Sequence, residues 1–210
     1  MKKIILLITA IVFMASSVIG QSGDSRSQFH FGLKAGVNFA NVYDAQGEEF
    51  TADGKIGFAG GAFVSIPIGS VFGFQPEILF SQKGFKAEGK LLGANYGLTR
   101  TTSFIDVPLF LAVKPVSALT LLAGPQFSYL MKRKDEFNSA AGTIEQIEEF
   151  ENDNIRKNIL GAVLGVDINV SQMVVGARAA WDLSTNNGDG SSDTPRYKNA
   201  WVQATLGFRF

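Results

Sequence analysis

The chain has 210 residues, with 19 basic and 19 acidic side chains, one histidine and no cysteine. This length allows one domain of ordinary size, the charge balance argues against nucleic acid as a partner, and the absence of cysteine excludes disulfides, thiolate catalysis and cysteine zinc sites. Glycine (23 residues) and phenylalanine (18 residues) are abundant, whereas charged residues make up 18% of the chain, against roughly 25% in an average soluble domain. Such a composition indicates strands that face an apolar environment.

The first 20 residues have the order of a secretory signal peptide. Lys2 and Lys3 precede an apolar run over 4–14, and small residues follow up to Gly20. The run is shorter than the about 20 residues that a transmembrane helix needs, which disfavours the alternative of an N-terminal anchor. We therefore expect residues 1–20 to be a signal peptide, followed by a polar leader over 21–28 and a single domain over 29–210.

The rest of the chain alternates apolar and polar residues with a period of two, which is the pattern of β-strands with one apolar face. In the last stretch, for example, Val202, Ala204 and Leu206 alternate with Gln203 and Thr205. The alternation occurs in eight stretches, at 29–40, 56–66, 72–83, 104–114, 119–131, 160–169, 175–183 and 200–210.

These stretches are long enough to cross a bilayer as tilted strands. A strand that rises about 3.3 Å per residue at a tilt of about 40° needs roughly 10 residues to cross an apolar band about 25 Å tall. Tight turns at 67–71, 115–118 and 170–172 alternate with long polar connections at 41–55, 84–103, 132–156 and 185–199. Because no strand edge can stay unpaired in hydrocarbon, the sequence predicts an all-β fold, an eight-stranded antiparallel up-and-down transmembrane β-barrel with short periplasmic turns and long extracellular loops.

The polar face of the strands is predicted to line a narrow interior. Nearly every strand glycine falls on that face, and eight strands leave an interior just wide enough for side chains. The charged residues on the same face carry both signs and are expected to pair, because an unpaired charge in a confined space is costly. We expect this lumen charge network to consist of Lys34, Glu77, Lys83, Asp106, Lys114, Asp167, Arg178, Asp182 and Arg209.

Three prolines, Pro76, Pro108 and Pro125, fall inside predicted strands. Proline has no backbone N–H to donate to a ladder, so it belongs at strand edges or bulges. Two hypotheses follow. The prolines mark bulges that steer the curvature of the barrel, or they mark a lateral opening in its wall for an apolar ligand or a lipid.

Several strand segments resemble the outer-membrane β-barrel domain family of Bacteroidetes, the PorT-like group. They are GLKAGVNF (32–39), GFQPEILFSQKG (73–84), IDVPL (105–109), AGP (123–125) and LGFRF (206–210). The resemblance covers nearly all of residues 29–210 and implies a membrane barrel, but it assigns no activity. The terminal Phe210 is similar to the signal that the barrel assembly machinery reads, so the resemblance implies that contact.

An enzymatic function is the first alternative to the structural one. Small outer-membrane barrels include lipid A acylases and deacylases, which use a histidine near the outer rim as a general base. The single histidine, His30, starts the first predicted strand at the periplasmic end, where it is badly placed for this chemistry. We expect no catalytic activity, no cofactor and no metal.

The connection over 132–156 holds two further features. Ile144, Ile147 and Phe150 recur at helical spacing, which predicts a short helical turn over the barrel mouth. The acidic residues between 145 and 153 lack the glycine-containing loop of a calcium site, so a solvated face is expected rather than a cation site.

The basic triplet Lys132, Arg133 and Lys134 opens the same connection. It lies at the predicted outer boundary of the membrane, where lipopolysaccharide phosphates are available. The triplet is therefore a candidate lipopolysaccharide contact.

Taken together, the sequence predicts a monomeric outer-membrane barrel with a plugged lumen and a structural or surface-interaction role. Expected partners are outer-membrane lipids and lipopolysaccharide, the barrel assembly machinery, and an unidentified surface or periplasmic protein. The alternative is a PorT-like secretion or transport component, or a lateral carrier of an apolar ligand. A soluble lipocalin-like barrel would bury the apolar faces instead; alternation does not separate these inversions, and the long loops and terminal phenylalanine favour the membrane.

Overall fold

The computed structural model describes residues 25–44, 53–91, 94–139, 142–148, 157–185 and 197–210. The predicted signal peptide lies outside these ranges. A short 3-10 helix, η1 (Ser25–Ser27), precedes the strands. The strands are β1 (His30–Asp44), β2 (Asp53–Ile68), β3 (Phe72–Leu91), β4 (Ala94–Val116), β5 (Leu119–Ser139), β6 (Gly142–Glu148), β7 (Asn158–Val170), β8 (Met173–Asp182) and β9 (Tyr197–Arg209).

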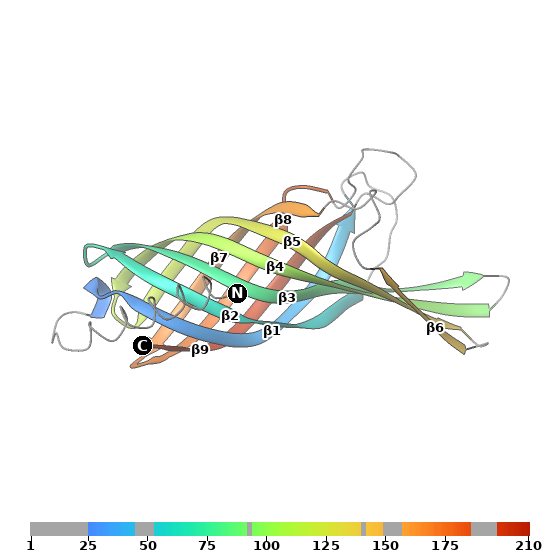
Figure 1. Ribbon diagram of the computed structural model, residues 1–210, viewed down its shortest axis with the longest axis horizontal. Coiled ribbons are helices and arrows are strands. Elements are labelled where there is room, and N and C mark those ends of the chain that lie inside the picture. The colour runs from blue at the N-terminus through green and yellow to red at the C-terminus, as the bar shows by residue number, and fades with distance from the viewer. Residues whose placement is uncertain (1–24, 45–52, 92–93, 140–141, 149–156, 186–196) are drawn as a thin grey trace, which may run out of the picture.

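The strands form one closed antiparallel barrel (Figure 1). Each strand pairs with its neighbours in the order β4-β3-β2-β1-β9-β8-β7-β5, and the pairing of β4 with β5 closes the ring. β6 pairs with the end of β5 and takes no place in the ring, so the wall has eight strands. The predicted eight-stranded up-and-down barrel is confirmed. Within the described ranges, no helix has the length and apolar character needed to cross a membrane.

The two ends of the barrel differ in how their strands are joined. Short turns at 69–71, 117–118 and 171–172 lie at one end, together with Phe210, and we call this the turn end. At the opposite, loop end, β3, β4 and β5 run beyond the barrel wall (Figure 1). The connection that was predicted at 84–103 is reduced to 92–93, because the β3–β4 ladder continues from Lys83↔Thr102 to Leu91↔Ala94. Beyond the apolar outer wall, the extended part of β3 and β4 no longer alternates apolar and polar residues, although its backbone pairing continues. The sequence pattern therefore ended before the strands did.

The helical turn predicted around Ile144 and Ile147 is wrong. Both residues lie in β6, where Ile144 pairs with Phe137 and Ile147 with Lys134 of β5. The third residue of that pattern, Phe150, lies outside the described residues. A spacing of three over so short a segment is a weak helical signal, and the extended β5 offers an unpaired row of backbone donors and acceptors that a strand can satisfy.

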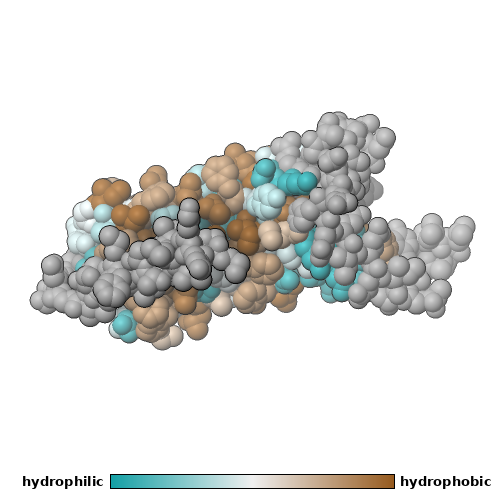
Figure 2. All heavy atoms as spheres, in the orientation of Figure 1, coloured by the Kyte–Doolittle hydropathy of each residue, from teal (hydrophilic) through white to brown (hydrophobic). Residues whose placement is uncertain are grey.

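Side chains alternate between the two faces of the wall as predicted. On β8, Val174, Gly176 and Arg178 are buried inside the barrel, whereas Val175 and Ala177 are exposed outside. The exposed large side chains are mostly apolar, and Figure 2 shows them gathered along the barrel wall. Inward glycines permit the tight curvature, since a Cβ at Gly36 would collide with the backbone of Ala204 and Thr205 on β9.

The bulge hypothesis for the strand prolines is also wrong. The register continues unchanged through Pro76↔Leu109, Pro108↔Gln126 and Pro125↔Ala162. The register shifts lie elsewhere, between Gly54 and Ala59, Ser103 and Phe104, and Val113 and Val116. Pro108 lies with its ring inside the barrel and is fully buried.

Leu164 tests which face of β7 meets lipid. Its side chain is 53% exposed on the outer wall, so Leu164→Arg should destabilise the folded barrel in a bilayer by about 2 to 4 kcal/mol. The measurement is the denaturant midpoint of the barrel in lipid vesicles. The folded fraction at each denaturant concentration is read from the difference in gel mobility between unheated and boiled samples. Leu164→Phe is the matched control and should fold like the wild type; equal stability of the arginine variant would contradict the assigned face.

Candidate functional site

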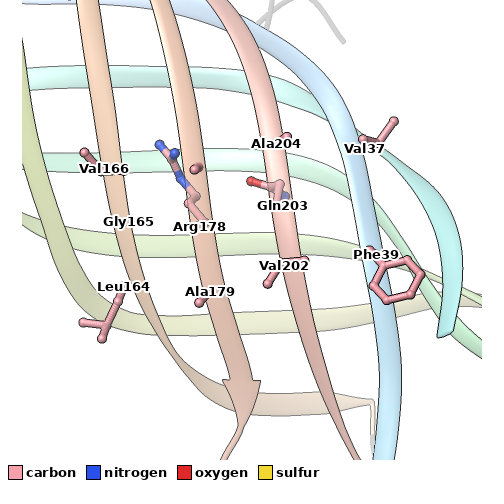
Figure 3. Close-up of a pocket in the computed structure, with 11 residues that line it drawn as sticks. Val37, Phe39, Leu164, Gly165, Val166, Arg178, Ala179, Val202, Gln203 and Ala204 are labelled. Carbon is pink, nitrogen blue, oxygen red and sulfur yellow. The ribbon is translucent and has the colours of Figure 1, made fainter.

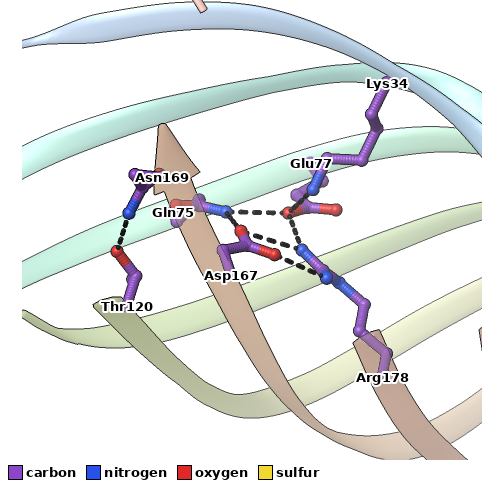
Figure 4. Close-up of polar contacts among 7 residues, drawn as sticks. All are labelled: Lys34, Gln75, Glu77, Thr120, Asp167, Asn169 and Arg178. Atoms are coloured by element: carbon purple, nitrogen blue, oxygen red, sulfur yellow. Dashed lines mark hydrogen bonds and ion pairs between the residues drawn. The ribbon is translucent and has the colours of Figure 1, made fainter. Parts of the chain in front are cut away.

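A network of ion pairs crosses the middle of the barrel interior (Figure 4). One oxygen of Glu77, Oε1, accepts hydrogen bonds from Lys34 Nζ (2.7 Å), Gln75 Nε2 (2.9 Å) and Arg178 Nη2 (3.1 Å). Arg178 also donates from Nη1 and Nη2 to the two oxygens of Asp167, at 2.8 and 3.2 Å. These residues come from β1, β3, β7 and β8 and hold two positive and two negative charges. The central network is therefore electrically balanced and ties opposite walls together.

Aromatic rings cover the cations of this network. Lys34 Nζ lies 4.6 Å from the centre of the Phe63 ring, and the Arg178 guanidinium lies 5.5 Å from that of Phe110. Both rings are buried inside the barrel. Such cation–π contacts stabilise desolvated charges. Sequence reasoning placed the phenylalanines on the membrane side and missed these inward rings, although Phe63 and Phe110 have the inward parity of their strands.

A second charged cluster lies on the loop side of the central network. Lys83 Nζ contacts both carboxylate oxygens of Asp106, at 3.2 and 3.1 Å, and donates to Ser128 Oγ at 3.3 Å. The same ammonium group lies 3.7 Å from the centre of the Trp201 ring. Asp182 accepts hydrogen bonds from the backbone and the side chain of Asn199.

The predicted lumen residues thus separate into groups. Lys34, Glu77, Asp167 and Arg178 come together in the centre, and Lys83, Asp106 and Asp182 lie nearer the loop end. Among the residues that the structure describes, the remaining two predicted lumen residues, Lys114 and Arg209, belong to neither cluster. Lys114 donates to Ser65 Oγ (3.0 Å) and to the Arg26 carbonyl (3.4 Å), and Arg209 donates to the Ser171 carbonyl (3.0 Å) at the turn end.

A third polar cluster lies at the loop end of the barrel. Arg100 on β4 forms a bidentate pair with Asp135 on β5, with Nε–Oδ1 and Nη2–Oδ2 distances of 2.7 and 2.8 Å. Its Nη1 donates to the Tyr197 hydroxyl at 3.1 Å, and Arg133 binds the same carboxylate at 2.6 Å. The rings of Phe85 and Tyr197 flank the Arg100 guanidinium. This rim cluster, which sequence reasoning missed, connects β3, β4, β5 and β9.

The rim cluster divides the basic triplet. An extra residue on β5 shifts the register between Ser103 and Phe104, so that Arg133 turns inward to Asp135. Lys132 and Lys134 lie on the opposite, outer face of the same ladder, and Lys134 pairs with Glu136 at 2.7 Å. Arg133 is therefore part of the rim cluster, and the two lysines are the members of the triplet that face outward.

The remaining features lie at the turn end and on the outer wall. The Phe210 backbone N–H donates to the Phe31 carbonyl, and the two rings stack with their centres 6.2 Å apart. His30 Nδ1 lies 3.4 Å from the Phe210 carbonyl oxygen. Within the part of the chain that the structure describes, no group of three or more histidine, aspartate or glutamate side chains is placed to hold a metal ion.

A shallow groove of about 600 Å³ lies on the outer wall over β1, β7, β8 and β9 (Figure 3). Its floor is formed by small residues, including Ala177, Ala179 and Ala204, and its sides by larger apolar ones such as Leu164 and Phe39. The groove is almost entirely apolar and faces the zone that a bilayer would occupy.

Asp135 gives a pH test of the rim cluster. Burial alone would raise the pKa of its carboxyl group, but hydrogen bonds from Arg100 and Arg133 outweigh burial and hold the pKa below its usual value. The folded protein therefore keeps the carboxylate charged at acidic pH values where the unfolded chain is already protonated. The stabilisation is complete above the unfolded pKa of about 3.9 and is lost as the pH falls through the folded pKa.

Asp135→Asn should accordingly lower the denaturant midpoint at pH 7, and the difference from the wild type should shrink as the pH falls below about 4. The measurement is denaturant unfolding in detergent at pH values from 7 to 3. Glu136→Gln, on the outer face of the same strand, is the control. A difference that is independent of pH would show that Asp135 does not act through its charge.

Comparisons with known proteins agree with this architecture. A family model for the outer membrane protein beta-barrel domain matches residues 19–187. The fold is similar to that of Ail, the attachment invasion locus protein of Yersinia pestis, in complex with the heparin analogue sucrose octasulfate, with a TM-score of 0.51, 14% identity, and coverage of 87% of this chain and 99% of Ail. Neisserial surface protein A gives a TM-score of 0.49 at 12% identity, covering 86% and 97% of the two chains. No curated protein matches the chain.

Proposed function

The chain belongs to the outer membrane protein beta-barrel domain family, and from this membership we propose that it is a non-catalytic barrel with a plugged lumen that acts through its surface. The observation that carries the proposal is the central network of Lys34, Glu77, Asp167 and Arg178, which joins four strands across the interior. An eight-stranded barrel is just wide enough for its own side chains. Charges that are paired, buried and covered by rings are suited to holding the wall together rather than to moving an ion.

Ion conductance tests the plugged lumen. The purified protein in planar bilayers should show no steady conductance. Arg178→Gln should destabilise the barrel by about 3 to 5 kcal/mol, because it leaves buried carboxylates without their cation, and it should create no selective conductance. A steady conductance in the wild type whose ion selectivity changes in Asp106→Asn would contradict the plugged lumen and favour a transport function.

The outward lysines of β5 are suited to contacts with lipid phosphates. Lys132 and Lys134 follow Tyr129 and Met131, which are exposed on the apolar outer wall of the same strand. Basic side chains at the edge of an apolar band bind phosphates by charge-assisted hydrogen bonds. The contact with outer-membrane lipids and lipopolysaccharide is thus assigned to Lys132 and Lys134, without Arg133.

Lysine substitution tests this contact. The double variant Lys132→Gln, Lys134→Gln should bind lipopolysaccharide more weakly in low salt, in a co-sedimentation assay of the detergent-folded barrel, and the difference should disappear in high salt. Arg26→Gln, Arg209→Gln removes the same charge at the turn end, where these side chains contact the Pro115 and Ser171 carbonyls, and is the control. Equal loss in both double variants would point to net charge rather than to this surface.

The finer assignments follow from the same proposal. Residues 1–20 are removed on export, Phe210 is read by the barrel assembly machinery, and the mature barrel is a monomer that offers its loop end to an unidentified surface or periplasmic protein. A PorT-like secretion or transport component is the alternative to this structural role, and the strand motifs named above do not by themselves assign it. Truncation of Phe210 should lower the assembly yield while the assembled fraction keeps its heat-dependent gel mobility.

One observation favours the lateral-carrier alternative. The pairing of β3 with β4 skips Glu77 and Ile78, opposite Val107 and Pro108. Gaps of the same length interrupt the β2–β3 ladder at Val64 and Ser65 and the β4–β5 ladder at Leu109 and Phe110, so backbone pairing is locally weaker in this part of the wall. Co-purification of a lipid that is lost on Pro108→Ala, with the fold retained, would favour the carrier over the plugged structural barrel.

A further inference from the structure

Among the residues that the structure describes, Asp182 is the acidic side chain of the interior whose hydrogen bonding is incomplete and whose charge has no dedicated cation. It is the last residue of β8 and is 1% exposed. Its Oδ2 accepts both the backbone N–H and the side-chain amide of Asn199, at the beginning of β9. Its Oδ1 is buried and has no hydrogen-bond partner among the residues that the structure describes.

The groups around Asp182 come from five strands. Within the described ranges, Lys83 on β3 and Asp106 on β4 are the charged side chains that act on it electrostatically. Asn199 on β9 donates to it, the Tyr43 hydroxyl on β1 donates to its backbone carbonyl at 3.2 Å, and its lateral partner on β7 is Gly161. Lys83 is already held by both oxygens of Asp106, by Ser128 and by the Trp201 ring.

The local charge count therefore differs from that of the central network. Two cations face two carboxylates in the centre, whereas one cation faces two carboxyl groups here. An ionised carboxylate that is buried without full pairing is strongly disfavoured. Binding a proton removes this excess charge and turns the unpartnered Oδ1 into a hydroxyl, while Oδ2 keeps both hydrogen bonds from Asn199.

Glu77 Oε2 is also buried without a partner, but its situation is different. The other oxygen of Glu77 receives three donors, two of them from the cations Lys34 and Arg178. The negative charge of Glu77 is thus compensated directly, whereas the donors to Asp182 are the neutral groups of Asn199. For the buried carboxyl group of Asp182, a bound proton can therefore supply the positive charge that Lys34 and Arg178 supply for Glu77.

We propose that Asp182 is a proton-binding site: its carboxyl group is neutral in the folded barrel at neutral pH, with the proton on Oδ1, and it holds the end of β8 to the beginning of β9. The contact between Asp182 and Asn199 joins these two strand ends. Loss of the proton at alkaline pH places a second negative charge beside Asp106 and competes for Lys83, which loosens this part of the loop end.

The sign of the pH dependence follows from the neutral folded state. A carboxyl group that is neutral in the folded barrel at pH 7 and ionised in the unfolded chain above about pH 3.9 makes the folded state less stable as the pH rises between these values. The contribution of Asp182 to stability is therefore largest at acidic pH and falls as the pH rises, which is opposite to that of Asp135.

Asp182→Asn is the decisive variant, because the amide is neutral and places a donor where the protonated oxygen would be. The variant should match or exceed the denaturant midpoint of the wild type at pH 7 to 8, and its advantage should grow with pH from 5 upward. The matched control is Asp167→Asn, which removes a carboxylate that Arg178 holds with two hydrogen bonds and should lower the midpoint at pH 7.

Infrared spectroscopy of the folded wild type gives a second measurement that needs no variant to fold. The C=O stretch of a protonated carboxylic acid should be present at pH 7, shift on exchange into deuterium oxide, be absent in Asp182→Asn and persist in Asp167→Asn. Absence of this band in the wild type at pH 7 would overturn the proposal. So would an Asp182→Asn midpoint that falls as far as that of Asp106→Asn at every pH, since Asp182 would then be a charged partner of Lys83.

Discussion

Closure of the ladder between β4 and β5 is the constraint on which the rest of the molecule depends. In hydrocarbon every backbone N–H and C=O must be paired within the protein, and a sheet achieves this by having no edge. Eight strands that close on themselves leave a small interior. Every inward residue must then fit beside residues from the opposite wall, which is why glycines such as Gly36 share that face with long charged side chains.

The narrow interior in turn determines the electrostatics. Charges that enter it lose their hydration, so they are stabilised by direct pairing and by aromatic rings. The central network satisfies this condition with equal numbers of cations and carboxylates, tied across four strands. The loop-side cluster satisfies it only in part, since Lys83 is committed to Asp106 and Asp182 is left to neutral donors. The structural role of the central network and the proposed proton binding by Asp182 thus have the same cause, which is the need to compensate a charge that has lost its hydration. The central network meets this need fully, and the loop-side cluster meets it in part.

Beyond the apolar band the constraint is relaxed, and the strands behave differently. β3, β4 and β5 continue as paired ribbons, and the Arg100–Asp135 pair with its two flanking rings anchors them to the start of β9. Here polar side chains lie on the inner face as well as on the outer one, and Asp135 and the Phe85 ring are buried within the rim cluster. The register shift at Ser103 and Phe104 decides which basic residues face the rim cluster and which face outward.

The sequence by itself determined the number of wall strands, their approximate positions and the face of most side chains in the wall, because a period of two is a local property of an extended chain. It also selected a set of charged residues on the inward face, from which the rim residues Arg100 and Asp135 were missing. The tertiary structure alone decided which of them meet: Glu77 with Lys34 and Arg178, Lys83 with Asp106, and Lys114 and Arg209 with neither cluster. Those partnerships depend on the tilt and register of strands that are far apart in the chain. The strand conformation of β6, the inward turn of Arg133 and the incomplete hydrogen bonding of Asp182 depend on strand pairing in the same way.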